Sequence, residues 1–324
     1  MSTTHSKAPS TIASTDLKPH GSNEQNNNTP PTTPTATSTT AHQLFTEIHT
    51  IHNDLKRLDD LAPGEKVNSL LTRLVDLCTR PYDSETTEAF LCITDVEALC
   101  PSLRSLCARA EGELEKHWAA NLLRASETSG NTFHFLRNEP YQLVFIGVLH
   151  TKELLQRFPY YQNYVDLSRL ESSLLNAFLL PHTGTSPLKI AFVGSGPLPL
   201  TSFCLLDTFT NATIHNIDRD VDAISQSKEL SRRLGYGERM TFACEDAHVQ
   251  CVGGTDWKTF DVVFLAALVG MTSDEKKSIL QELGGKLKKG CLIICRSARG
   301  LRSVLYPVSE HCGGWLKEDV LIVA

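Results

Sequence analysis

The sequence predicts an α/β protein, in which an N-terminal helical-bundle domain precedes a doubly wound parallel sheet with helices on both faces. Three observations lead to this prediction. In the first half of the chain, apolar residues recur at every third or fourth position, as on one face of a helix. In the second half, short continuous apolar runs alternate with helical patterns, as in a parallel sheet. A glycine-rich turn at residues 194–196 joins the first of these runs to a helix.

Composition divides the chain into three parts. Residues 1–41 are rich in Ser, Thr, Pro and Asn and contain almost no large apolar side chain, so we expect a disordered low-complexity tail. Residues 42–182 are expected to form the helical domain, and residues 183–324 the sheet domain.

Charge and hydropathy exclude several classes of partner. The chain has 324 residues, a net charge of −6 and 41% hydrophobic residues. It has no basic field for nucleic acid, no apolar run near the ~20 residues that span a bilayer, and no charged segment followed by an apolar leader. We therefore expect a cytoplasmic protein with a small-molecule substrate and no nucleic-acid or membrane partner. The cysteines and histidines lack metal-ligand spacing, so no metal is expected. No flavin is expected either.

The glycine-rich turn has the features of a ligand-binding loop. Residues 190–193 predict a buried strand, the glycines allow a sharp turn close to a ligand, and the helix that begins near Pro199 presents free N–H groups. The third glycine of the dinucleotide fingerprint is absent, which favours another ligand. The expected binding loop is Gly194, Ser195, Gly196 and Pro197.

The next two predicted strands end in acidic residues. Residues 212–217 lead into Asp218, whose carboxylate can accept both hydroxyls of a ribose. Residues 240–243 lead towards Asp246 and Ala247, where a carboxylate can accept from an adenine amino group. Together with the glycine loop, these strand ends favour S-adenosylmethionine (SAM). A sheet that binds another nucleotide, or none, remains the alternative.

Apolar spacing predicts the helices of the first half. They cover residues 44–58 and 67–75, two short stretches at 85–92 and 95–100, and a long stretch at 103–123. A further helix begins at Pro159, with Leu167, Leu170, Leu174 and Phe178 on its buried side.

Two segments of these helices combine polar groups with apolar faces. In AEGELEKHW, residues 110–118, Glu111 and Glu115 share one helix face beside the apolar stripe; this spacing suits a functional carboxylate pair and also a solvated acidic face. In residues 158–164, Tyr160 and Tyr164 share a face and Tyr161 lies on the neighbouring one. These rings can line a pocket that attracts a sulfonium cation, or they can pack in the core.

Three further strands complete the predicted sheet, the last of them around residues 315–323. Residues 260–265 predict the fourth strand, after which nitrogen methyltransferases that use SAM often place an Asp or Asn followed by Pro and an aromatic residue. Here residues 266–270 are small or apolar, so the usual methyl-transfer apparatus is absent. Residues 291–295 predict the fifth strand. Arg296 then either binds a substrate carboxylate through two parallel hydrogen bonds or closes the sheet as a surface arginine.

Five segments resemble the nicotianamine synthase family, in the same order. They are residues 110–118, RFPYYQNYVDLSRLE at 157–171, IAFVGSGPLPLTS at 190–202, FDVVFLAALVGM at 260–271 and RSARGLRSVLYP at 296–307. Five ordered matches are far more specific than one loop. The resemblance, to a fungal-type member, runs from His42 to the C-terminus and implies a helical domain over a SAM-binding Rossmann-like domain.

The resemblance also implies a reaction. Three SAM molecules are joined through their aminobutyrate (3-amino-3-carboxypropyl) parts, methylthioadenosine is released each time, and an azetidine ring closes to give a metal chelator. By this comparison Glu111 is the base, and Tyr160 binds the attacking amine or relays its proton. Apolar walls that include Ala266 and Leu268 would contact SAM and keep the chamber dry. Second choices for substrate binding are Glu115, His117, Tyr161 and Tyr164.

Other functions stay open on the sequence alone. A SAM-dependent methyltransferase of a small amine would release S-adenosylhomocysteine instead of methylthioadenosine. A SAM-binding protein without activity could use the same fold. Plant-type members continue with a further strand beyond the position of Ala324, so the last sheet edge is expected to be incomplete or covered by another chain, which leaves a homo-oligomer open.

Overall fold

The computed structural model describes residues 36–132, 151–179, 187–246, 254–308 and 321–323. Most of the expected tail, residues 1–35, lies outside this part of the chain. Residues 36–324 form one compact unit, and its first helix already begins at Ala36, within the segment expected as tail.

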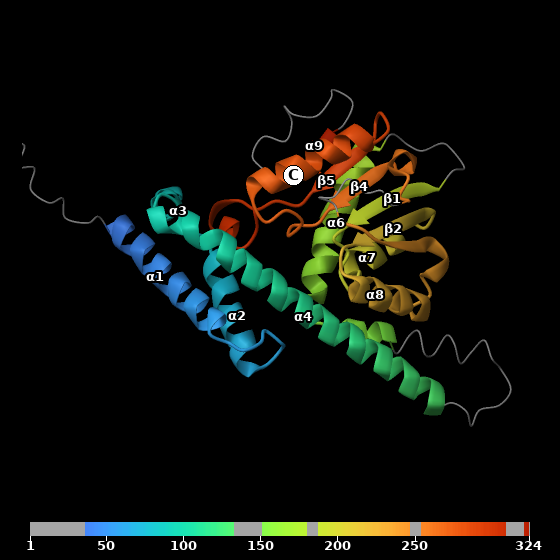
Figure 1. Cartoon of the computed structure of the whole chain (residues 1–324), viewed down its shortest axis with the longest axis horizontal. Coiled ribbons are helices and arrows are strands. Elements are labelled where there is room, and N and C mark those ends of the chain that lie inside the picture. The colour runs from blue at the N-terminus through green and yellow to red at the C-terminus, as the bar shows by residue number, and fades with distance from the viewer. Residues whose placement is uncertain (1–35, 133–150, 180–186, 247–253, 309–320, 324) are drawn as a thin grey trace, which may run out of the picture. The chain divides into compact units, whose positions relative to one another are not determined.

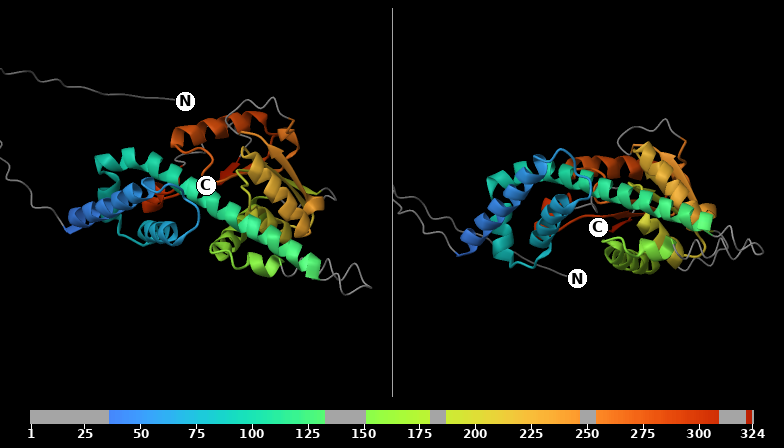
Figure 2. Two further views of the ribbon diagram at one scale, coloured as in Figure 1. Left: turned by 60° about the horizontal axis from the view of Figure 1, so that its bottom comes forward. Right: turned by 90° about the horizontal axis from the view of Figure 1, so that it is seen from below.

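Four helices form the first part of this unit (Figure 1). They are α1 (Ala36–Lys56), α2 (Glu65–Thr79), α3 (Ser84–Leu91) and α4 (Thr94–Thr132). Their apolar faces meet in one core, in which Ile48, Leu74, Phe90 and Leu103 are almost completely buried. The far part of α4 leaves this core and packs along α8 beside the sheet, as the views of Figures 1 and 2 agree.

Helix α4 is continuous where two helices were expected. Pro101 stands inside it, although proline lacks the N–H that a helix interior needs and its ring crowds the preceding turn. The proline is exposed, while Leu99 and Leu103 on either side of it are buried in the helical core. This packing outweighs the local cost of the proline. Residues 95–100 and 103–123 therefore belong to one helix of 39 residues.

The second part is a six-stranded parallel sheet with strand order β3-β2-β1-β4-β5-β6. The strands are β1 (Leu188–Val193), β2 (Ala212–Asp218), β3 (Met240–Cys244), β4 (Val262–Leu265), β5 (Leu292–Cys295) and β6 (Leu321–Val323). The order reverses between β1 and β4, as in a doubly wound sheet. This confirms the predicted fold class.

Both faces of the sheet are covered. Ile190 and Phe192 of β1 belong to one core and the alternate residues, Ala191 and Val193, to another. The first core includes side chains of α7 (Leu200–Thr208) and α8 (Val221–Arg233), and the second those of α9 (Ser273–Lys286). Continuous apolar strands are therefore buried on two sides, as their sequences predicted.

Helix α6 (Tyr161–Phe178) packs in the opposite sense to the prediction. Leu167, Leu170 and Phe178, expected on its buried side, are exposed, and Leu174 is half-buried. The buried residues of the helix are Ser168, Glu171, Ser172 and Leu175. The expectation was wrong because the inward face of α6 meets charged and polar groups at the carboxyl edge of the sheet instead of an apolar core.

Candidate active site

The site lies at the carboxyl edge of the sheet, where the strand order reverses. Gly194 and Gly196 follow β1 with φ of +81° and +65°, a backbone conformation that side chains disfavour. A Cβ on Gly194 would lie 2.4 Å from Cγ2 of Val269, and one on Gly196 would lie 2.5 Å from Oε2 of Glu115. The segment after β4 and helix α4 therefore close directly onto the glycine loop, which leaves no room for a side chain there.

Polar groups of the loop suit a polar ligand. Asp218, at the end of β2, accepts the N–H of Gly196 at 2.8 Å on one oxygen and the N–H of Asp220 at 3.0 Å on the other. Each carboxylate oxygen keeps a further acceptor position, which a ribose hydroxyl can use. The hydroxyl of Ser195 is buried and has no hydrogen-bond partner among the described residues. Such a group is costly unless a ligand satisfies it, so these residues fit a molecule such as SAM.

The other predicted SAM contacts lie around the same loop. Asp246 follows the end of β3 directly after Glu245, whose N–H donates to the carbonyl of Asp218 at 3.0 Å. The N–H of Ala266 donates to the carbonyl of Val193 at 3.1 Å, and Leu268 is half-buried two residues later. Pro197 is buried in the loop, and Ala247 lies outside the described residues.

The carboxyl group of Glu115 on α4 faces this loop, and that of Glu111 lies about one helical turn before it. The hydroxyl of Tyr306 donates to Oε1 of Glu111 at 2.9 Å, and the hydroxyl of Tyr164 donates to Oε1 of Glu115 at 3.0 Å. Both glutamates are half-buried. Desolvation raises the pKa of Glu111 to about 7, and desolvation together with the charge of Glu111 raises the pKa of Glu115 to about 8. Each group is thus poised to exchange a proton near neutral pH.

The tyrosines of the expected pocket take different places. Tyr160 lies directly before α6 and feels the charge of Glu111. Burial and this charge raise the pKa of Tyr160, so it keeps its proton. Tyr161 instead feels the charges of Cys204 and Asp207 on α7. Tyr160 therefore lies near Glu111, and Tyr161 lies near α7.

Two other expected substrate contacts differ from the structure. His117 is exposed and lies about 200° around α4 from Glu115, because the two are separated by two residues of a helix. The structure therefore does not bring His117 to the carboxyl pair. Arg296 donates through Nε and Nη2 to Glu171 at 2.7 and 2.9 Å, and through Nη2 to Thr201 at 2.9 Å. Its two parallel bonds, expected for a substrate carboxylate, are made to a buried carboxylate of α6, which requires a charged partner.

Sequence reasoning did not single out three residues that shape the site. They are Tyr306 and Glu171, described above, and Lys276. Lys276 of α9 is buried and donates through Nζ to the carbonyls of Ala266, Ala267 and Arg296 at 3.2, 2.8 and 3.3 Å, which fixes the chain ends after β4 and β5. Tyr306 and Glu171 lie within the segments 296–307 and 157–171 that carry the resemblance, which was the one available signal.

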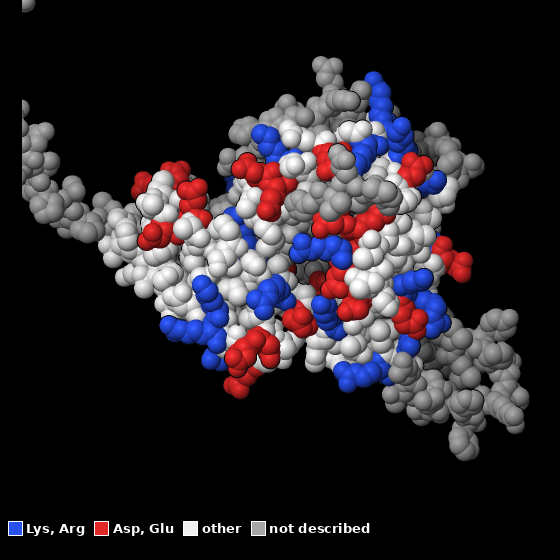
Figure 3. All heavy atoms as spheres, in the orientation of Figure 1, with Lys and Arg blue, Asp and Glu red and all other residues white. Residues whose placement is uncertain are grey.

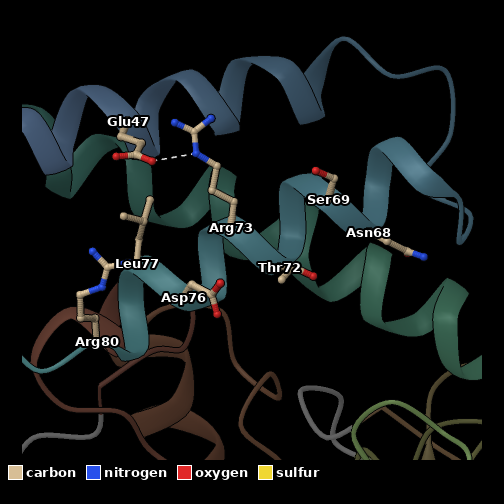
Figure 4. A pocket seen from close by; sticks show the side chains of 8 residues that line it. All are labelled: Glu47, Asn68, Ser69, Thr72, Arg73, Asp76, Leu77 and Arg80. Carbon is tan, nitrogen blue, oxygen red and sulfur yellow. Dashed lines mark hydrogen bonds and ion pairs between the residues drawn. The ribbon is translucent and has the colours of Figure 1, made fainter.

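A separate pocket opens between α1 and α2 (Figure 4). It has a volume of about 400 Å³ and is lined by Glu47, Asn68, Ser69, Thr72, Arg73, Asp76, Leu77 and Arg80. Nε of Arg73 donates to Glu47 at 2.7 Å; the side chain of Arg73 is exposed and that of Glu47 is half-buried. None of the site residues lines this pocket, so it is not part of the candidate active site.

Charges of both signs are interspersed on the face shown in Figure 3. None of the described helices is both long and apolar enough to span a bilayer. Within the same ranges, no group of three or more His, Cys, Asp or Glu side chains is arranged to hold a metal ion.

Several known proteins are similar to this chain. The family described as "Nicotianamine synthase protein" matches residues 37–153 and 147–322. Nicotianamine synthase 2 of Arabidopsis thaliana is 34% identical over 268 residues, which cover 82% of this chain and 74% of the relative. Nicotianamine synthase of Solanum lycopersicum is 36% identical over 263 residues, which cover 80% and 72%.

Solved structures share the fold. A glutamate-to-glutamine variant of MtNAS has a TM-score of 0.60 and 18% identity, with 86% of this chain and 88% of that chain covered. MtNAS in complex with MTA and tNA has a TM-score of 0.61 and 18% identity, with 83% and 87% covered. The family match spans most of the sequence, including the glycine loop and both glutamates. The chain therefore belongs to the nicotianamine synthase family.

Proposed function

We propose that the chain is a nicotianamine synthase that uses SAM as its sole substrate. It joins three SAM molecules by successive 3-amino-3-carboxypropyl transfer, closes an azetidine ring and releases three molecules of methylthioadenosine. The observation that carries this proposal is the contact of Glu115 with the glycine loop: its Oε2 leaves no room for a side chain on Gly196, and Glu111 lies about one turn away on α4. This contact supports a base beside the expected SAM site.

The chemistry needs a proton acceptor at this place. The α-ammonium group of one aminobutyrate gives a proton to the ionised carboxylate of Glu111, and the neutral amine then attacks Cγ of the next SAM. The Cγ–S bond breaks, its electron pair passes to sulfur, and the sulfonium leaves as neutral methylthioadenosine. The new secondary ammonium loses a proton in turn. A pKa of about 7 suits Glu111 to this role, since it is substantially ionised at neutral pH.

The remaining residues hold the substrates. Asp218 accepts the ribose hydroxyls and Asp246 the adenine amino group, while Ser195 gives its unused hydroxyl to the ligand. The side chains of Ala266 and Leu268 line the chamber with apolar surface and limit the entry of water. A dry chamber favours the neutral, nucleophilic amine over the ammonium ion. The hydroxyl of Tyr160 binds the amine or relays its proton.

The cell compartment and the role of the product belong to the same proposal. All eight cysteines in the described ranges are free thiols, as in proteins of a reducing compartment, and we place the enzyme in the cytoplasm. The product, a chelator with several amine and carboxylate groups, serves metal homeostasis.

Product analysis tests the function. The full chain is incubated with SAM alone, and the products are identified by mass spectrometry. We expect nicotianamine and methylthioadenosine in a ratio of one to three. Formation of S-adenosylhomocysteine would instead identify a methyltransferase, and calorimetric binding of SAM without turnover would identify a protein that only binds it.

A further inference from the structure

The chain after β5 returns from the sheet to the N-terminal helices. It passes through the short helix η4 (Gly300–Val304), and Leu301, Val304 and Leu305 are buried in the core formed by α1 to α4. Figure 1 shows this segment in red beside α2 and α4, elements that it contacts. A segment that follows the sheet in the sequence therefore forms part of the helical core.

Arg104 of α4 ties this segment to the helix. Its Nε and Nη2 donate to the carbonyl of Ser303 at 3.2 and 2.5 Å, and its Nη1 donates to the carbonyl of Met271 at 3.2 Å. A guanidinium offers its donors in a rigid planar arrangement, so these bonds fix direction as well as distance. Arg104 thus holds η4 and the chain after β4 in a set position on α4.

The same docking of the segment on α4 brings Tyr306 next to Glu111. Arg104 and Glu111 are seven residues apart and share one face of α4, while Ser303 and Tyr306 are three residues apart on the docked segment. The N–H of Tyr306 donates to the carbonyl of Arg302 at 3.1 Å and closes the last turn of this segment. The Arg104–Ser303 and Tyr306–Glu111 contacts therefore join the same two elements, α4 and the segment after β5.

We infer that Tyr306 is a positioning residue for the catalytic base, and that Arg104 acts through it by holding its segment against α4. The hydroxyl of Tyr306 donates a hydrogen bond to Oε1 of Glu111, which holds the carboxylate in one orientation. Oε2 then accepts the proton of the substrate amine. This inference rests on the proposed function, since it assigns a role within that reaction.

The electrostatic setting agrees with this role. Burial raises the pKa of Tyr306, so its hydroxyl stays protonated and acts as a donor to Glu111. The donated bond lowers the pKa of Glu111 and partly offsets the desolvation that raises it. The other titratable groups that face Glu111 are Cys107, Glu115, Tyr160 and Tyr164.

The substitution Tyr306→Phe tests the inference, because it removes one hydroxyl and keeps the ring. We expect the acid limb of kcat/KM to move to higher pH, with activity about tenfold lower at pH 6 and within about threefold of the wild type at pH 9, since one pKa unit is a tenfold change in the ionised fraction. Tyr82→Phe is the matched control: its hydroxyl is buried without a hydrogen-bond partner in the described structure, and its pH profile should equal that of the wild type.

A second variant separates positioning from general damage. Arg104→Lys should also move the acid limb of kcat/KM to higher pH, by less than Tyr306→Phe does. The double variant Arg104→Lys/Tyr306→Phe should move it no further than Tyr306→Phe alone, because Arg104 acts through Tyr306. An unchanged acid limb in either single variant, or shifts that add up in the double variant, would overturn the inference. The proposed function would still hold in that case, provided that the wild type forms nicotianamine. Failure of the wild type to form nicotianamine would instead remove the proposed function.

Discussion

The two glutamates of α4 show how burial raises the pKa of carboxyl groups that usually lie on the surface. Their spacing of four residues places them on one helix face, and the closing of the sheet edge over this face removes water from them. Desolvation is the first cause of the raised pKa of both carboxyls, while Tyr306 and Tyr164 each donate a hydrogen bond that opposes the rise. The balance of desolvation and hydrogen bonding leaves the pKa values of the two carboxyls at about 7 and about 8.

The pKa of Glu111 predicts the pH dependence of the reaction. As the base, Glu111 must be ionised, so kcat/KM should rise with pH through about 7 and then level off. Initial rates of methylthioadenosine release between pH 5.5 and 9 measure this. A rate that is flat or falls between pH 6 and 8 would contradict the assignment of Glu111.

Glu115 should make stability depend on pH. Its pKa is about 8 in the folded chain against an ordinary 4.5, so between these values the folded chain binds more protons than the unfolded chain. The stabilisation that the Glu115 carboxyl contributes is fully present below pH 4.5 and is lost as the pH rises to about 8. Glu115→Gln should therefore raise the free energy of unfolding at pH 8 by on the order of 4 kcal/mol and at pH 5 by less than about 1 kcal/mol.

Denaturant unfolding at pH 5 and pH 8 measures this difference. The control is Glu113→Gln, an exposed glutamate on the same helix, which should leave the pH dependence of the wild type unchanged. If the free energy of unfolding changed equally between pH 5 and pH 8 in Glu115→Gln and in the wild type, the carboxyl of Glu115 would not be desolvated.

At the residue scale, local spacing predicted what a single element determines. The pairs Glu111 with Glu115, and Tyr160 with Tyr164, follow from helix periodicity. The contact between Glu111 and Tyr306 joins residues 195 positions apart, and no local pattern encodes such a pairing. For the same reason the sequence could not show that the two parallel bonds of Arg296 are made to Glu171.

At the scale of elements, α6 presents its polar face inward. Tyr164, Ser168 and Glu171 recur at helical spacing on the face towards the site, whereas Leu167 and Leu170 point outward. Apolar periodicity assigns the burial of a helix on the assumption that the core is apolar. Where the facing groups are polar, as they are here, the assignment is reversed, although the existence of the helix is still predicted.

The Glu171–Arg296 pair connects α6 to the end of β5. Both side chains are largely buried, with exposed fractions of 5% and 14%. Glu171→Gln leaves a buried guanidinium without its counter-charge, so we expect a loss of about 3 to 5 kcal/mol in the free energy of unfolding. Asp166→Asn, which breaks the exposed pair with Arg169 on the same helix, should cost less than about 1 kcal/mol. Similar losses for the two variants would contradict the burial of the first pair.

Helix α4 carries a glycine that its packing does not require. A Cβ on Gly112 would meet no atom of other elements within 4 Å, and glycine in a helix interior is about 1 kcal/mol less favourable than alanine. Gly112→Ala should therefore raise the free energy of unfolding by about 0.5 to 1 kcal/mol. Ala120→Gly, the reverse change on the same helix, should lower it by a similar amount. Destabilisation by Gly112→Ala would show that the space beside it is occupied.

At the scale of the whole molecule, the candidate active site is assembled from distant parts of one compact unit. The sheet supplies the glycine loop and Asp218, α4 supplies the carboxyl pair, and the segment after β5 supplies Tyr306. The sequence predicted the sheet because each strand is a short apolar run, and the loop because glycine and acidic residues follow those runs. It did not predict the unbroken α4, because packing on both sides of Pro101 outweighs the local preference of that residue.

The central claim is that Glu111 is the base that lets one SAM molecule be alkylated by another. The most direct measurement compares Glu111→Gln with Glu113→Gln for nicotianamine formation from SAM, followed by mass spectrometry, with SAM affinity measured by calorimetry. We predict that Glu113→Gln matches the wild type, whereas Glu111→Gln binds SAM with unchanged affinity and forms nicotianamine at least about 100-fold more slowly. Product formation by Glu111→Gln at the wild-type rate would contradict the account.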